Sequence, residues 1–519
     1  MNASIPFRIT PLRWMLEPRH AAWLVPLSAG LPQLAFPPLE WAPVAWIALV
    51  PLLMWAERGR ASWGFGIGWG WGLVYNAIQF RWLPEALLEK GGLTGPTFAV
   101  LTSVTLAVAA LYPAAAIGLT RWLRIRFGVP IWSSFPVLFS VQDALLGVTP
   151  LGGFPWGSLA ATQTETWVAV WAVPVFGGSG LVFLLAAANS CCASVVLGGA
   201  GTARKANRGW PLSVAALLAL LALCNWPSPA AETAGTGQEV WIVPGDVPVQ
   251  ILARSSQGEE VLRGYLAKTL PALQWAATSR EPALVIWPES AVPGEVSQGR
   301  KLADLFELSS VMQVDFLFGS NTRERGRLFN SIFLVGSERF QTLRYDKRHL
   351  VPFGEYVPDM FRSWFGKKLT EGVQDYASGG GPALLDWRGT KLGLAVCFES
   401  ILPGHARGAA LDGAEVLIVL SNDQWLTASA SRQHLRLIAL RSLEIGREAL
   451  AATNGGWSGH VRQGKLAAAS ARGGALLRVS FERASHQTPW TRWGYASLGA
   501  LFVLWLAAVG TWRGLRQRW

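Results

Sequence analysis

Charged residues and cysteines are both scarce in this chain of 519 residues. Charged side chains make up 15% of the sequence, hydrophobic ones make up 51%, and the mean hydropathy is +0.29. A chain this apolar is not an ordinary soluble protein, so we expect part of it to lie in lipid. Only four cysteines occur, and three of them (Cys191, Cys192 and Cys224) fall in or beside apolar segments. No disulfide framework is therefore expected, and Cys397 stands alone as a free thiol.

Two kinds of ligand motif are missing as well. No pair of His or Cys residues has zinc-like spacing, and no glycine-rich phosphate loop follows a strand-like run, so we expect neither a metal nor a nucleotide cofactor. The formal net charge is +12, but the basic residues do not form one patch interleaved with aromatic residues, which argues against nucleic acid. They lie at the ends of apolar runs, which favours anionic lipid headgroups as partners.

Long apolar runs fill the first half of the chain and return near its end. The runs cover about 21–36, 41–56, 62–80, 97–120, 131–151, 167–199, 211–226 and 493–512. We predict that each is a transmembrane helix, although the first two share the proline-rich join LAFPPLEWAP and could instead form one re-entrant hairpin. This predicts a membrane domain of about seven helices over 1–226, a globular domain over 227–490, and a final helix with a basic tail over 491–519.

Basic residues cluster in alternate connections between these runs. The clusters are Arg8, Arg13, Arg19; Arg58, Arg60; Arg121, Arg124, Arg126; Arg204, Lys205, Arg208; and Arg513, Arg516, Arg518. The short loops between them hold only Arg81 and Lys90. By the positive-inside rule the clusters are cytoplasmic, and seven spans then place residues from about 227 to 490 on the outer side. A re-entrant hairpin in place of the first two spans would also leave its two flanking clusters on one side, so the outer placement of 227–490 is unchanged.

The globular segment alternates between two kinds of pattern. Short strand-like apolar runs occupy 239–246, 283–290, 314–320, 329–336, 391–400, 414–423 and 448–456. Helix-like segments lie near 257–279, 297–312, 402–412 and 430–447. This alternation predicts an α/β domain, and polar residues follow several strands, where such sheets place their ligands.

Three polar residues of this domain have the chemistry of a nucleophilic site. Glu289 follows LVIWP, Cys397 follows LGLAV, and Lys347 lies in the loop RYDKRHLVPFGEYVP. A carboxylate can take the proton of a thiol, and an ammonium can stabilise first the thiolate and then an oxyanion. Each residue alone is weak evidence, because a lone cysteine after an apolar strand is more often a small core residue.

The surrounding motifs are more specific than the three residues. WPES at 287–290, KRHLVPFGEYVP at 347–358, CFE at 397–399 and SNDQW at 421–425 follow one another, and GFPW stands at 153–156 in the membrane half. With these motifs the sequence resembles the apolipoprotein N-acyltransferases, membrane-bound members of the nitrilase superfamily. The resemblance implies a multi-span helical membrane domain joined to a nitrilase-like α-β-β-α sandwich.

The resemblance also implies roles for five residues. Glu289 would be the general base, Lys347 the cation beside the oxyanion and thiolate, and Cys397 the nucleophile, while Glu355 and Glu399 match acidic positions that support them. From the physical chemistry we expect both extra carboxylates to hold Lys347 charged and oriented, against the alternative of simple surface salt bridges.

The reaction that the resemblance implies is an acyl transfer in a bacterial inner membrane. A phospholipid would donate its acyl chain to the cysteine, and the amino group of a diacylglyceryl-cysteine on an apolipoprotein would accept it on the periplasmic side. Two alternatives remain from the sequence. One is a membrane-tethered amidase or hydrolase, in which water attacks the thioester, and the other is a binding or transport protein with a degenerate nitrilase domain.

Some positions depart from the family pattern or have two interpretations. Phe398 stands where the family commonly has tyrosine, Leu426-Thr427 replaces Phe-Gly, and residues 251–253 lack a tryptophan often found there. Asp143 lies inside an apolar run, where an ionisable group is functional, caps a helix or faces a wet cavity. His349 either positions a headgroup phosphate or makes a structural hydrogen bond.

Overall fold

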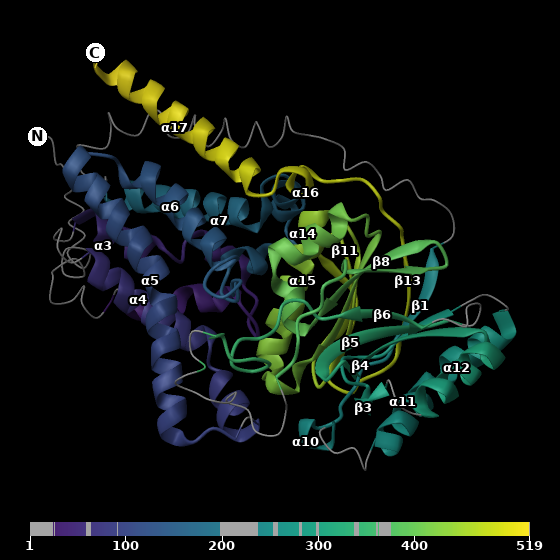
Figure 1. The fold of residues 1–519 in the computed structure, drawn as a ribbon. Helices are drawn as coiled ribbons and strands as arrows, with labels where there is room; N and C mark the ends of the chain where they lie inside the picture. The colour runs from purple at the N-terminus through teal and green to yellow at the C-terminus, as the bar shows by residue number, and fades with distance from the viewer. Residues whose placement is uncertain are drawn as a thin grey trace, which may run out of the picture.

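A computed structural model describes the chain in two parts that pack against each other, a helical half and an α/β half (Figure 1). The described residues are 24, 26–58, 64–90, 92–197, 237–252, 258–279, 283–296, 300–336, 342–359, 362 and 375–517. The predicted span at 211–226 lies outside them.

The α/β half contains thirteen strands in the described residues. They are β1 (Gln238–Ile242), β2 (Ala283–Ile286), β3 (Val292–Glu295), β4 (Val314–Glu324), β5 (Arg327–Val335), β6 (Leu343–Asp346), β7 (Leu384–Trp387), β8 (Thr390–Val396), β9 (Val416–Asn422), β10 (Ala449–Asn454), β11 (Ser458–Arg462), β12 (Lys465–Ser470) and β13 (Leu477–Phe481). Its helices are α10 (Val249–Leu252), α11 (Gly258–Ser279), α12 (Arg300–Met312), η9 (Cys397–Ile401), α14 (Pro403–Leu411), η10 (Asp423–Trp425) and α15 (Ala428–Ile445). All seven predicted strands and all four predicted helices are present.

These strands form two sheets that stack face to face. The first sheet has the order β13-β1-β2-β4-β5-β6, with β3 paired to β4, and the second has the order β12-β11-β10-β9-β8-β7. Side chains alternate between the two faces of each strand. Ile242 of β1 and Ile418 of β9 therefore lie in the core between the sheets, whereas Trp241 packs against α11 and α12 and Leu417 packs against α14 and α15. The four layers confirm the predicted α-β-β-α sandwich.

The central strands of both sheets are parallel. In the first sheet β1, β2 and β4 run the same way, and in the second sheet β8, β9 and β10 do. Parallel strands bring their carboxyl ends to one edge, which is where an α/β sheet binds its ligands. Glu289 follows β2 at this edge, and Cys397 directly follows β8.

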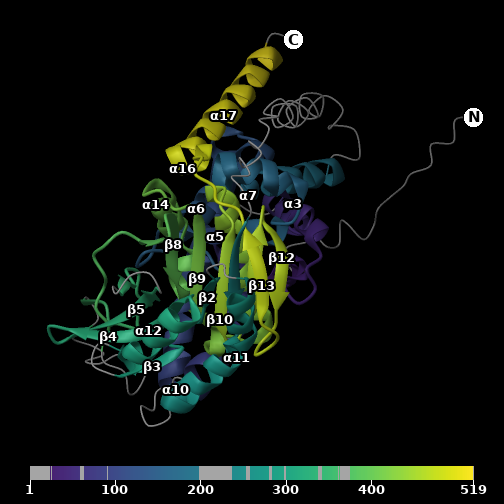
Figure 2. The ribbon, with the colours of Figure 1, turned by 90° about the vertical axis from the view of Figure 1, so that its right-hand side faces the viewer.

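The helical half consists of helices of very different length. They are η1 (Ser28–Ala35), η2 (Ala42–Trp46), α3 (Val50–Arg58), α4 (Gly64–Gln79), η4 (Glu85–Lys90), α5 (Gly95–Phe127), α6 (Ile131–Leu146), η5 (Leu159–Gln163), α7 (Trp167–Leu197), α16 (Pro489–Trp493) and α17 (Tyr495–Gln517). The helix α17 extends away from the α/β half (Figure 2), and its first turns pack on the core of α6 and α7.

Two described helices are long and apolar enough to cross a membrane, Gly95–Phe127 and Trp167–Ser194. In the most apolar stretch of the first, only 28% of the residues are buried, and Val100, Val104 and Leu111 are exposed. A helix of this composition in a soluble core would be buried, so the exposed stripe fits contact with lipid.

Two of the other expected spans are shorter than predicted, because the helices α4 and α6 have 16 residues each. The helix α17 has 23 residues and covers the predicted run at 493–512 except for its first two residues. The first two apolar runs form η1, η2 and α3, with 8, 5 and 9 residues, instead of two continuous helices. A hydrocarbon layer about 30 Å thick needs about 20 helical residues, so none of these three crosses it alone.

Glycine in the GFGIGWGWG segment of α4 allows α5 to approach closely. A Cβ atom at Gly72 would lie 2.6 Å from Pro113 Cγ, and one at Gly68 would lie 2.9 Å from the Ala114 backbone. Only a residue without a side chain fits at such distances. The glycines of this segment therefore allow close packing between α4 and α5.

Candidate active site

Glu289 reaches the site because the neighbouring strand leaves room for its backbone. The residue follows Trp287 and Pro288 after the end of β2, and Gly319 of β4 lies beside it. A Cβ atom at Gly319 would lie 2.6 Å from Glu289 Cα, closer than real Cβ contacts allow. This close approach requires glycine at position 319.

The Glu289 carboxylate is buried and held by two donors. Asn330 Nδ2 donates to Oε1 at 2.7 Å, and the backbone N–H of Asn422 donates to Oε2 at 2.8 Å. Burial raises the pKa of Glu289, and the charge of Lys347 opposes this shift only in part. A carboxylate with a raised pKa is a better proton acceptor than an exposed one.

Lys347 is the most deeply buried cation of the site, with 1% of its surface exposed. It follows β6, and its backbone N–H donates to the Asn330 carbonyl at 2.8 Å. Its Nζ donates to Glu355 Oε1 at 2.8 Å. Burial works to lower the pKa of Lys347, but Glu355 and the other acidic groups around it outweigh burial and raise that pKa. The ammonium is therefore charged at neutral pH.

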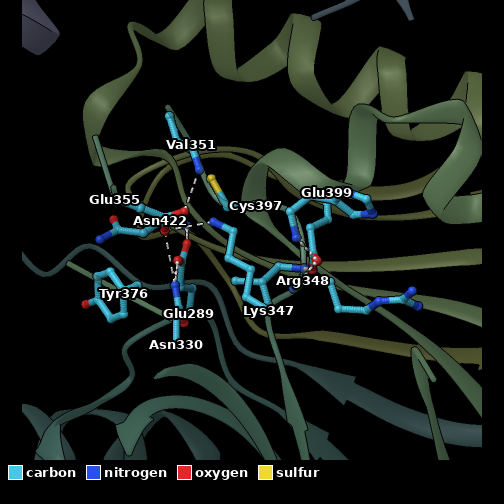
Figure 3. Close-up of polar contacts among 12 residues, drawn as sticks. Glu289, Asn330, Lys347, Arg348, Val351, Glu355, Tyr376, Cys397, Glu399 and Asn422 are labelled. Atoms are coloured by element: carbon cyan, nitrogen blue, oxygen red, sulfur yellow. Dashed lines mark hydrogen bonds and ion pairs between the residues drawn. The ribbon is translucent and has the colours of Figure 1, made fainter. Parts of the chain in front are cut away.

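Cys397 is the first residue of η9 and directly follows the last residue of β8. Its φ of +50° lies in the left-handed region, which costs a residue other than glycine about 1–3 kcal/mol and persists where the surroundings enforce it. Burial, followed by the charge of Glu289, raises the pKa of Cys397 to about 12. The thiol is thus protonated at rest and needs a base. Figure 3 shows its sulfur beside the ammonium of Lys347, with Glu289 and Glu355 converging from the other side.

Glu355 has the contact that the sequence predicts. Its Oε1 accepts from Lys347, and its Oε2 accepts from the backbone N–H of Val351 at 2.8 Å. The second bond closes the turn that carries Glu355 itself. One carboxylate therefore orients both the ammonium and the loop 351–355.

Glu399 differs from the prediction, because its hydrogen bonds go to groups other than Lys347. The fully buried carboxylate accepts from Tyr345 Oη at 2.9 Å and from the backbone N–H groups of Arg348 (2.7 Å), His349 (3.0 Å) and Val396 (2.9 Å). Tyr345, Arg348 and His349 lie within two residues of Lys347 in the chain. Val396 directly precedes Cys397. Glu399 thus ties the two backbone segments together instead of binding the ammonium.

Comparisons with known proteins cover both halves of the chain. The family model of the apolipoprotein N-acyltransferase N-terminal domain matches residues 28–191, and that of the carbon-nitrogen hydrolases matches residues 252–482. The apolipoprotein N-acyltransferase of Geobacter metallireducens is 30% identical over 86% of this chain and 87% of its own length. The chain belongs to the apolipoprotein N-acyltransferase family. The relative from Methylococcus capsulatus is also 30% identical, over 91% of this chain and 92% of its own.

Among solved structures, a carbon-nitrogen hydrolase superfamily protein from Xanthomonas campestris aligns with 48% of this chain and 91% of its own. The TM-score is 0.38 and the sequence identity is 16%.

Two departures from the family pattern have local explanations in this member. The ring of Phe398 stacks on Phe154 of the GFPW motif, with 6.0 Å between ring centroids, and Leu426 packs in the same cluster. Thr427 caps the N-terminus of α15, where its side chain accepts from Ala430 N. In residues 251–253, Ile251 packs partly against the core beneath α11, and residue 253 lies outside the described part of the chain.

Asp143 and His349 each have more than one interpretation from the sequence, and the structure shows which groups surround them. Asp143 of α6 accepts a hydrogen bond from Ser179 Oγ of α7 at 2.8 Å, so it joins two helices. The ring of His349 lies edge-on to His405, with 5.4 Å between centroids, and its backbone N–H is the group that contacts Glu399. Neither observation shows a role in the reaction.

Sequence reasoning missed several residues of the site. Asn330 lies in a predicted strand with no signal that sets it apart, although it contacts both Glu289 and Glu355. Asn422 and Asp423 belong to the SNDQW motif, but the motif does not reveal their partners. His434 lies within a predicted helix, and only the packing of that helix brings it close to the Cys397 turn.

Proposed function

We propose that this protein transfers an acyl chain from a phospholipid to the amino group of a diacylglyceryl-cysteine on an apolipoprotein, through a thioester on Cys397. One observation carries the proposal. A partly buried thiol meets a buried carboxylate and a buried ammonium at the sheet edge where Phe398 packs on Phe154 of the helical half. The site thus adjoins the part of the chain that would lie in lipid.

The first half-reaction forms the thioester. Glu289 takes the thiol proton as the sulfur of Cys397 attacks the ester carbonyl of the phospholipid, and the oxyanion that develops lies near the charged Lys347. When the intermediate collapses, the C–O bond of the ester breaks. The lysophospholipid oxygen leaves with the proton held by Glu289, and the acyl chain stays on the sulfur.

The second half-reaction releases the acyl chain to nitrogen. The neutral amine attacks the thioester carbonyl, Glu289 accepts a proton from the amine nitrogen, and Lys347 again faces the oxyanion. The C–S bond then breaks, and Cys397 recovers its proton from Glu289. The product is an amide, and the enzyme returns to its starting state.

A multi-pass arrangement with the α/β half on the periplasmic side supports this chemistry. Phospholipid and acceptor are both anchored in the membrane, so a site tethered beside the same leaflet meets them at a high effective concentration. The exposed apolar stripe of α5 and the distribution of basic residues support the arrangement.

Hydrolysis is the alternative reaction for the same three residues. It is not favoured, because the two relatives described above carry the acyltransferase name and match 86% and 91% of the chain, the helical half included. A binding protein with a degenerate site is not favoured either, because such a protein has no need to keep Glu289, Lys347 and Cys397 together.

Intact-protein mass spectrometry tests the proposal. The purified enzyme is incubated with phospholipid alone, and wild type is compared with Cys397→Ala. We expect a mass increase of one acyl chain that is labile to hydroxylamine and absent in the variant. Addition of a diacylated lipopeptide should remove the adduct and give an N-acylated peptide. Wild-type protein that binds lipid without an adduct would exclude the thioester, and release of free fatty acid in place of N-acylated peptide would show a hydrolase.

A further inference from the structure

A buried chain of polar groups lies behind the nucleophile. The carbonyl oxygen of Cys397 accepts from Ser400 Oγ at 2.6 Å, and Ser400 Oγ lies 2.8 Å from His434 Nε2. On the other side of the imidazole, Nδ1 lies 3.0 and 3.2 Å from the two oxygens of Asp423. Ser400, His434 and Asp423 are all buried. None of them has a part in the two half-reactions described above.

Counting hydrogens gives the direction of each bond. A carbonyl oxygen can only accept, so the Ser400 hydroxyl donates to Cys397 and must itself accept from His434 Nε2. Asp423 also accepts from Ser421 Oγ and Ser431 Oγ, each at 2.6 Å. One further proton is therefore shared between Nδ1 and the carboxylate.

The charges of the pair place that proton on the imidazole. Burial works to lower the pKa of His434, but the adjacent Asp423 outweighs burial and raises it. Burial likewise opposes ionisation of the aspartate, yet His434 and the two serine hydroxyls lower the pKa of Asp423. Both ring nitrogens then carry hydrogen, and the imidazolium donates to Ser400 and to Asp423 at once.

The positive φ of Cys397 needs support on both sides of the residue. Before the cysteine, the backbone N–H of Val396 is held by Glu399. After it, the carbonyl oxygen is held by Ser400, and Ser400 is held by His434. We propose that His434, fixed by Asp423 and acting through Ser400, is a positioning residue that keeps the Cys397 turn in the conformation from which its sulfur attacks. This inference rests on the proposed role of Cys397 as nucleophile.

The helix that carries His434 also joins the site to the helical half. The preceding residue, Gln433, donates to Gln79 Oε1 of α4 and to the carbonyl oxygen of Trp156, both at 2.8 Å. The ring of Trp156 lies 6.4 Å from that of His434. Adjacent residues of α15 thus contact the nucleophile turn on one side and the membrane helices on the other. The network sets the position of Cys397 relative to the surface from which lipid arrives.

Paired substitutions of His434 separate its two hydrogen bonds. In His434→Gln the amide nitrogen reaches the place of Nε2 and can still donate to Ser400, whereas in His434→Asn it reaches the place of Nδ1 and keeps only Asp423. Ser400→Ala removes the donor to Cys397, and Ser400→Thr retains it. The rate of Cys397 acylation by phospholipid is measured in a single turnover by intact mass, with the melting temperature of each variant recorded.

We expect His434→Asn and Ser400→Ala each to slow acylation at least about tenfold, with the phospholipid concentration for half-maximal rate unchanged. His434→Gln and Ser400→Thr should stay closer to wild type. The double variant Ser400→Ala/His434→Asn should be no slower than either single variant, because both act through one bond to Cys397. Residues that only stabilise the fold would instead lower the melting temperature and give additive effects.

Three outcomes would overturn the inference. The first is acylation of Ser400→Ala and His434→Asn at the wild-type rate per folded molecule. The second is an additive double variant, and the third is a loss of rate that follows the melting temperature alone. In all three the wild type still forms its thioester, so the proposed function stands. Absence of an adduct in the wild type is a different result, which removes the proposed function and this inference with it.

Discussion

Replacing Gly319 with alanine tests whether the reaction depends on where the backbone holds Glu289. The new methyl carbon would lie 2.6 Å from Glu289 Cα, 2.8 Å from Ser290 N and 3.0 Å from the Pro288 carbonyl oxygen. All three neighbours are backbone atoms, so no side-chain rotation relieves the contact. Real Cβ contacts lie beyond 3.0 to 3.4 Å, and the segment must therefore shift by about 0.4 to 0.8 Å.

Such a shift should displace the Glu289 carboxylate while the protein stays folded. Overpacking of a core costs about 1–3 kcal/mol of stability, which most domains survive. Misplacement of a catalytic group by about 1 Å can cost about 100-fold in rate, so we expect Gly319→Ala to slow acylation of Cys397 by about 10- to 100-fold. Because the substitution changes no cysteine, the number of thiols that react under denaturing conditions stays the same.

The assay is single-turnover acylation by phospholipid, combined with thermal unfolding. Gly264→Ala is the matched control, because it adds the same methyl to a position in α11 with nothing within 4 Å. The control should acylate at the wild-type rate and melt at the same temperature or slightly higher. A Gly319→Ala enzyme that acylates as fast as wild type would refute the argument that the β4 glycine sets the position of Glu289.

Three further predictions concern charge and packing at the site. Glu355→Gln removes the charged partner of Lys347, and we expect acylation to fall roughly 10- to 100-fold, the equivalent of one charge-assisted hydrogen bond. The wild-type rate should fall as pH drops through a pKa above the ordinary carboxyl value of 4.5, because Glu289 must be ionised to accept the proton and burial raises its pKa; a rate–pH profile measures this. Phe154→Ala removes ring packing beside the nucleophile and should raise the KM for phospholipid about three- to tenfold in steady-state assays.

Controls distinguish each of these effects from general damage. Glu295→Gln changes an ion pair at the surface, and its rate should stay within about twofold of wild type. An equal loss in both glutamine variants would contradict the orienting role of Glu355. An acid limb at or below the ordinary carboxyl value would contradict a raised pKa at Glu289. An unchanged KM in Phe154→Ala would show that the aromatic contact has no part in donor binding.

The sequence by itself determined the architecture of the α/β half and three chemical groups of its site. Strand and helix patterns depend on residues close together in the chain, and a buried parallel strand is a continuous apolar run whatever its partner. Glu289 and Cys397 stand directly after such runs, so their meeting at one sheet edge followed from the strand direction. The position of Lys347 at this edge was predicted only from the family motif that surrounds it. Lys347 follows β6, which pairs antiparallel with β5, so the rule that parallel strands end at one edge does not apply to it.

Other features depended on packing between distant segments. The short strands β3, β6, β7, β11, β12 and β13 were not predicted, because four to six residues with mixed burial carry little periodic signal. The proline-rich start of the helical half has the composition of a span, yet it forms short helices that pack on α7. Glu40 in this segment forms ion pairs with Arg432 and Arg436 of α15.

Tertiary structure alone decided which groups surround Lys347 and Cys397. Glu399 has the charge to bind Lys347, but folding places backbone N–H groups of two segments around it, and a buried carboxylate accepts those donors. His434 lies 34 residues from Ser400 and lacks any signal of function in its helix. Its place beneath Cys397 comes from the docking of α15 on the second sheet, a contact between surfaces that no local pattern encodes.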